Sequence, residues 1–172
     1  GLAIRGKGAR GIIFQLAEGM MHGHLSEIPI GAYKKGHRHP GGTHVMCVTG
    51  TGYSLLWFEG DQEFMRVDWK HGLVFPPDDR QFHQHFNLST QPSRYLATRT
   101  GSMRYPFTKA RRKSSGGLSD KDAATGTLSV RQGGDQIEYE DQDPRIHPIY
   151  AAEMKKRGLT ISPELAKLFP ES

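Results

Sequence analysis

Residues 31–44 read GAYKKGHRHPGGTH, and residues 72–87 read GLVFPPDDRQFHQHFN. Each stretch contains a pair of histidines separated by one residue. Side chains two residues apart on an extended strand point to the same face, and imidazole is a common ligand for transition metals. The two stretches therefore predict a metal site built on extended segments, and its candidate members are His37, His39, His44, His83 and His85.

The chain around these stretches is a series of short runs rich in apolar and aromatic residues, separated by glycine, proline and aspartate. Many short runs with turn residues between them are typical of antiparallel strands in a sandwich or barrel. No helical period interrupts them. The expected strands are residues 12–16, 20–28, 42–48, 53–59, 64–69, 72–75, 82–87 and 94–98.

The sequence changes character after the last of these runs. Residues 108–134 are polar, small and basic, and they predict a flexible loop. Further on, Asp143-Pro144 or Pro148 signals a helix start, Gly158 a stop, and Ser162-Pro163 a second start. These signals predict a helical tail that packs on the barrel or forms a dimer interface.

We therefore divide the chain into four parts. They are an N-terminal extension (1–10), a barrel (11–107), a flexible basic loop (108–134) and a C-terminal helical tail (135–172). A chain of 172 residues is long enough for one such domain with a hydrophobic core. Because the sequence opens at Gly1 without a methionine, we expect it to be trimmed from a longer chain.

Composition argues against several classes of partner and compartment. The formal charge of +5 is spread along the chain except at residues 109–113, where no aromatic residues interleave for base stacking, so we expect no nucleic-acid partner. No run approaches the roughly 20 apolar residues of a membrane span, and the N-terminus lacks a signal-peptide pattern. The single cysteine, Cys47, excludes an internal disulfide and indicates a reducing compartment, for which we expect the cytoplasm.

The first quoted stretch resembles the first motif of the cupin superfamily. That motif is a glycine, five residues, His-x-His, three or four residues, a glutamate, six residues and a glycine. Here five residues separate Gly31 from His37, and four separate His39 from His44. His44 stands where the family has its glutamate, and five residues rather than six lead on to Gly50.

The second quoted stretch resembles the second cupin motif, which is a glycine, a proline turn and then His-x-x-x-Asn. Gly72 begins it, Pro77-Asp78-Asp79 takes the place of the turn with one extra residue, and His83 and Asn87 follow at the family's spacing. The two motifs occur in the family's order with a hairpin between them. The resemblance covers residues 31–87.

The resemblance implies a mainly β fold, a single jelly-roll barrel of the double-stranded β-helix type, here with a C-terminal helical appendage. It also implies that His37, His39, His44 and His83 bind one divalent metal. His85 shares a strand face with His83. We expect it to be either a substitute ligand or a catalytic acid or base beside the metal.

Strand parity gives a first prediction of the pocket wall. Tyr33 and Lys35 share parity with His37, and Met46 shares it with His44, so these three residues are expected to line the substrate pocket. Lys35 would bind a substrate carboxylate there or extend along the barrel rim. A second pair, His22 and His24, has no partners at cupin spacing, and it occupies either ordinary strand positions or the wall of the same cavity.

A site of neutral imidazoles keeps the full charge of a divalent metal, which favours anionic, chelating substrates. We therefore expect a metal-dependent enzyme that acts on a small organic acid or oxygenated ring. Histidine-rich cupin sites without glutamate resemble those of iron(II) dioxygenases, so Fe2+ is the expected metal, with Zn2+, Mn2+ or Ni2+ as alternatives.

Two other classes of function remain open. Zinc or manganese would indicate a lyase or isomerase, and a non-catalytic small-molecule binding or sensor protein is a further alternative. In each case we expect a homodimer with a small-molecule ligand and no nucleic-acid or membrane partner.

Overall fold

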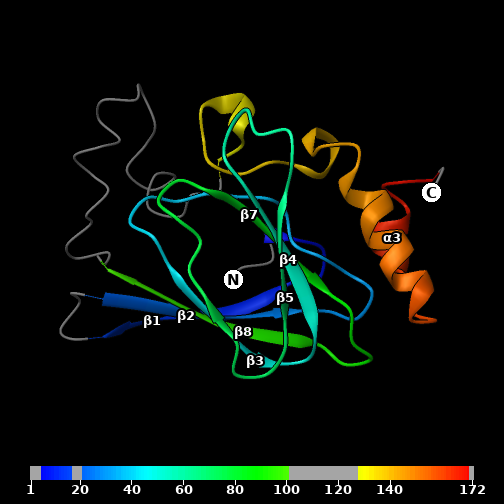
Figure 1. Ribbon diagram of the computed structural model, residues 1–172, viewed down its shortest axis with the longest axis horizontal. Coiled ribbons are helices and arrows are strands. Elements are labelled where there is room, and N and C mark those ends of the chain that lie inside the picture. Colours follow the sequence, from blue (N-terminus) through cyan, green and yellow to red (C-terminus); the bar gives the residue numbers. More distant parts are fainter. Residues whose placement is uncertain (1–4, 17–20, 101–127, 171–172) are drawn as a thin grey trace.

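The computed structural model describes residues 5–16, 21–100 and 128–170 (Figure 1). These residues form strands in the first two segments and short helices in the third. The elements are β1 (Arg10–Leu16), β2 (Met21–Ile28), β3 (His44–Thr49), β4 (Gly52–Trp57), β5 (Met65–Trp69), β6 (Val74–Phe75), β7 (Phe82–Asn87), β8 (Ser93–Thr100), η4 (Val130–Gln132), η5 (Tyr139–Asp141), α3 (Ile146–Lys156) and α4 (Pro163–Ala166).

The strands form two antiparallel sheets. One has the order β1-β2-β8-β3-β6 and the other the order β5-β4-β7. The segment that precedes β3 lies along the free side of β7 and pairs with it at two isolated bridges, Tyr33 with Phe86 and His37 with His83. Each predicted strand is present, and the arrangement is the jelly-roll barrel that the two motifs imply.

The barrel interior is filled from both sheets. Alternate residues of β3 and β8 meet side chains of β4 and β5, as expected for two sheets whose inner faces pack together. The buried apolar cluster between the sheets comprises Ile28, Ala32, Val45, Cys47, Leu56, Trp69, Phe75, Tyr95 and Ala97.

The outer face of the three-stranded sheet is also covered. β4 and β7 are buried along almost their whole length, on both faces. The reason is that α3 lies beside β4 and β5 (Figure 1) and shares one buried cluster with side chains of β4 and β7. Tyr150 of α3 also donates a hydrogen bond to the carbonyls of Ala32 and Asn87, at 3.2 and 3.1 Å. This outer cluster comprises Tyr33, Tyr53, Leu55, Phe86, Leu88, Tyr139, Ile146, Tyr150, Met154 and Leu165.

The helix signals of the tail correspond to real helix ends. α3 begins two residues after Pro144, and Gly158, at φ +63°, follows its end. Ser162 caps α4 by accepting a hydrogen bond from the amide of Leu165. Most of the expected flexible loop, residues 108–127, lies outside the described residues, and residues 128–134 contain the short helix η4. Within residues 5–16, 21–100 and 128–170 no helix is long and apolar enough to cross a membrane.

Gly31, the first residue of the cupin-like motif, is a point of contact between the barrel and the tail. Its φ is +69°, and its carbonyl accepts a hydrogen bond from the amide of Ser162 at 2.8 Å. A Cβ at this position would lie 2.5 Å from the carbonyl oxygen of Thr160. Only glycine meets both conditions, because it tolerates positive φ and has no Cβ to clash with the tail.

We expect Gly31→Ala to destabilise the protein more than Gly72→Ala. Both glycines have positive φ, +69° and +79°, so each alanine costs about 1 to 2 kcal/mol of backbone strain. A Cβ at Gly72 meets nothing within 4 Å. Denaturant unfolding of the two variants therefore isolates the clash with the tail, and equal losses of stability would contradict the packing of the tail on Gly31.

Candidate metal centre

Backbone pairing brings the two His-x-His segments together. The amide of His37 donates to the carbonyl of His83 at 3.1 Å, and the amide of His83 donates to the carbonyl of His37 at 2.9 Å. Directly paired residues of antiparallel segments have their side chains on the same face. The two rings therefore lie side by side, with centroids 4.3 Å apart, and the ring of His39 lies 4.9 Å from that of His83.

These three imidazoles form the candidate metal-binding triad. The ligand atoms of His37, His39 and His83 all lie within 4.8 Å of one another, and the three residues are buried. Nδ1 of His37 donates to the carbonyl of Lys35 at 3.2 Å, and Nδ1 of His83 donates to that of Gln81 at 3.0 Å. Since a carbonyl can only accept, both rings carry their proton on Nδ1 and keep the Nε2 lone pair for a metal.

Burial holds the triad in the form that binds metals. It lowers the pKa of His37 and His39 well below 6.5 and that of His83 to about 4. The positive charge of Arg5 is the next cause for His37. The imidazoles are thus neutral at physiological pH, which is the state required of a histidine ligand. The donor set and its burial fit a divalent transition metal.

His44 does not join the triad, contrary to the four-ligand prediction. It is exposed at the start of β3, whereas the next residue, Val45, and then Cys47 are buried in the barrel. His44 and Met46 belong to the alternate set that faces away from this interior, so Met46 does not line the pocket either. The prediction took the orientation of β3 from the family's ligand position, but the apolar residues of the strand determine it.

A β-bulge separates Tyr33 from the triad. Tyr33 pairs with Phe86 and His37 pairs with His83, so four residue steps on one segment oppose three on the other. An extra residue on one strand shifts the alternation of side chains by one position. Tyr33 and His37 therefore face opposite sides of the sheet although their spacing in the sequence is even.

Because of the bulge, Tyr33 and Lys35 point away from the barrel interior and Lys34 points into it. Tyr33 lies in the outer cluster, where its hydroxyl is 3.1 Å from Nδ1 of His147. Lys35 forms an ion pair with Glu138. Neither residue lines the pocket as parity predicted. Lys34 points into the barrel instead, and it is 1% exposed.

His85 lies next to the triad. Its ring centroid is 5.4 Å from that of His83 and 6.2 Å from that of His37. Its Nδ1 is 2.7 Å from the hydroxyl of Ser54, which holds the ring in place. His85 is therefore outside the group of close ligand atoms but beside it, where a proton donor or acceptor would be useful.

The second histidine pair of the sequence lines the same interior. His24 packs edge-on against Tyr95, with ring centroids 6.0 Å apart, and Nε2 of His22 accepts a hydrogen bond from Nε of Arg99 at 2.5 Å. The signal in the sequence is alternation: His22, His24 and Ser26 occupy every second position of β2, and Ser26 is fully buried. The strand register places the pair on the inner face of β2, where His24 is opposite Ala97 and Ser26 is opposite Tyr95.

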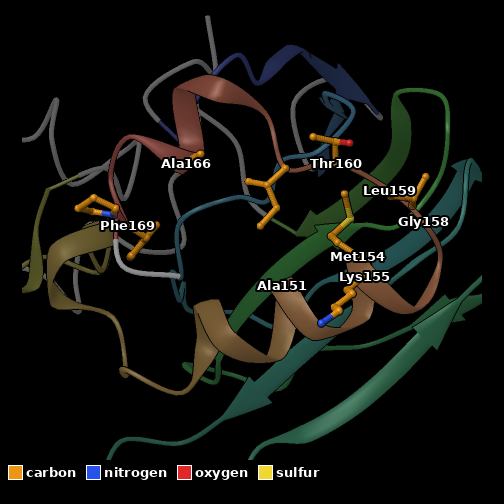
Figure 2. A pocket seen from close by; sticks show the side chains of 10 residues that line it. Ala151, Met154, Lys155, Gly158, Leu159, Thr160, Ala166 and Phe169 are labelled. Atoms are coloured by element: carbon orange, nitrogen blue, oxygen red, sulfur yellow. The ribbon is translucent and has the colours of Figure 1, made fainter.

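A groove of about 570 Å3 lies on another part of the molecule, between α3 and the chain leading to Pro170 (Figure 2). Its lining is mainly apolar. Apart from Lys155, none of the side chains around it can titrate, and it contains no histidine, cysteine or carboxylate. The chemistry of the described residues is therefore concentrated inside the barrel.

The likeness to solved structures extends over little more than half of this chain. An oxalate decarboxylase matches 58% of this chain and 27% of its own, with 18% identity and a TM-score of 0.50. An oxalate oxidase in complex with glycolate matches 55% of this chain and 51% of its own, with 16% identity and a TM-score of 0.47. Vicilin from Corylus avellana matches 55% and 30%, with 10% identity and a TM-score of 0.48.

The comparison first defines a class, small jelly-roll barrels of two antiparallel sheets. The motif order and the histidine triad resemble those of cupins. The chain spans between about a quarter and a half of the length of these structures, and at such low identity the likeness concerns the fold alone. No protein-family model and no curated protein matches the sequence.

We predict that His37→Ala and His83→Ala each abolish stoichiometric metal binding, whereas His44→Ala retains it. The triad residues supply the ligand nitrogens, and His44 lies outside the group. Metal content after purification and dialysis, measured by plasma emission spectroscopy, distinguishes the two outcomes. Loss of metal in His44→Ala with retention in His37→Ala would contradict the assignment.

Proposed function

We propose that the protein is a metal-dependent cupin enzyme that acts on a small organic acid. The observation that carries this proposal is the buried triad of His37, His39 and His83 with two rings fixed through Nδ1. Three nitrogen ligands leave roughly three positions of an octahedral ion for substrate and a co-reactant. Since the ligands are uncharged, the ion keeps its full positive charge and attracts a carboxylate.

Within this proposal we favour an iron(II)-dependent dioxygenase. The ligand set contains no carboxylate, and in this respect it resembles cupin sites of that class. A bound Fe2+ would supply oxygen activation, whereas Zn2+ or Mn2+ would supply Lewis-acid polarisation for a lyase or isomerase.

The protein's own residues provide the remaining functions of the site. His85, beside the triad and held by Ser54, is the proposed general acid or base. Behind it, the space between its ring and the neighbouring side chains is too small for a water molecule. The residues that line this space are Val45, Cys47, Trp69, Phe75, His85 and Tyr95.

Metal analysis of protein purified without added metal, combined with an oxygen-uptake assay on a panel of small carboxylic acids, tests the proposal. We expect one metal ion per chain and oxygen uptake with at least one acid. Zinc or manganese with conversion of the acid but no oxygen uptake would support the lyase or isomerase. Binding of an acid without turnover would support the non-catalytic alternative, and a protein without stoichiometric metal would overturn the proposal.

We predict that His85→Gln keeps the metal but lowers kcat by about a hundredfold or more, the usual contribution of a general acid or base. The matched control is Ser54→Ala, which removes only the hydroxyl that holds the ring and should lower kcat much less. Wild-type kcat in His85→Gln with the metal bound would exclude a role in proton transfer.

A further inference from the structure

Lys34 occupies an unusual position inside the barrel. It is 1% exposed, and its ammonium donates hydrogen bonds to the hydroxyls of Ser26 at 3.2 Å and Tyr95 at 2.9 Å. Within the described part of the chain it forms no ion pair with a carboxylate. Burial lowers the pKa of Lys34. A buried ammonium whose hydrogen-bond partners are neutral hydroxyls is unfavourable unless an anion also pairs with it.

Arg5 adds to the positive charge around Lys34: its carbonyl accepts a hydrogen bond from the amide of Lys35 at 2.7 Å, and its charge is among the causes that lower the pKa of Lys34. After burial, the positive charge of Arg5 is the next largest cause that lowers the pKa of His37, and the charge of Lys34 lowers it too. The positive charges of Arg5, Lys34 and Arg99 also lower the pKa of His83.

The buried carboxylates of the described residues are engaged elsewhere. Asp135 accepts a hydrogen bond from Arg38, and Glu153 of α3 pairs with Arg157. Neither side chain bonds to Lys34. Among the residues that the structure describes, Lys34 is therefore a buried positive charge without a carboxylate partner.

The other side of His85 is apolar. The tightly packed space behind its ring is bounded by Val45, Cys47, Trp69 and Phe75, and it has no room for a water molecule. Tyr95 stands between this wall and Lys34, since its hydroxyl accepts from Lys34 and its ring centroid lies 4.5 Å from that of His85. An anion at the triad would be attracted toward Lys34 and excluded from the apolar wall.

We propose that Lys34 forms an anion subsite beside the triad that binds a carboxylate of the substrate. This inference rests on the proposed function and narrows its substrate class to acids with two acidic groups. One group chelates the metal at the triad, and the other takes the ammonium of Lys34 as its partner. The second carboxylate of the substrate then balances the positive charge of Lys34 inside the barrel.

The test compares a dicarboxylate with a monocarboxylate in four forms of the protein. Wild type, Lys34→Met, Lys35→Met and His37→Ala are loaded with Co2+, whose visible absorption reports occupancy of the triad. Each is then titrated with malonate and with acetate. Lys35→Met is the matched control, because Lys35 is the adjacent lysine and pairs with Glu138 outside the pocket.

We expect Lys34→Met to bind Co2+ as wild type does but to lose about tenfold or more of its malonate affinity, the value of one charge-assisted hydrogen bond. Its acetate affinity should stay near that of wild type, and Lys35→Met should match wild type with both ligands. If Lys34→Met does not fold, Lys34→Gln removes the charge while keeping a donor for Ser26 and Tyr95, and it replaces Lys34→Met in the comparison.

The outcomes separate the two proposals. Equal malonate affinity in wild type and the Lys34 variant, with Co2+ bound in both, would overturn the subsite and leave the metal site intact. A malonate loss of the same size in Lys35→Met would also overturn it. Failure of wild type to bind Co2+ more strongly than His37→Ala would overturn the proposed function, and the subsite with it.

Discussion

The reciprocal backbone hydrogen bonds between His37 and His83 are the constraint on which the candidate site depends. They align two segments that are far apart in the sequence and place two imidazoles on one face. The bulge that precedes them is equally important. Without the extra residue between Tyr33 and His37, the alternation would continue, and the ring of Tyr33 would face the same side as the triad.

The bulge also determines what kind of pocket surrounds the triad. It turns Lys34 inward, where hydroxyls of β2 and β8 receive it, and it leaves Lys35 to pair with Glu138. The interior is consequently cationic on one side of His85 and apolar on the other. Such a division would orient the anion that we propose as substrate, because only one wall offers it hydrogen-bond donors.

Much of the fold could be predicted from the sequence, because turn residues and apolar runs report strands directly. The positions of His37, His39 and His83 followed from the motif spacing. The faces of β3 and of the segment before His37 could not be predicted in the same way. The place of His44 in the motif predicts a metal ligand, whereas the apolar residues Val45 and Cys47 indicate that the other face of β3 is buried. The bulge has no clear signature in the residues around Lys34.

Placing so many polar groups inside the barrel has a consequence for stability. Imidazoles and an amine contribute little apolar burial, so the interior cluster alone is a modest core. The large aromatic residues are instead concentrated on the outer face of β4 and β7, under α3. Each such side chain contributes about 2 kcal/mol when it is buried, and removal of the tail would expose several of them. The helical tail is therefore part of the folding unit: it stabilises the sheet from outside and allows the inner face of the same strands to carry the site.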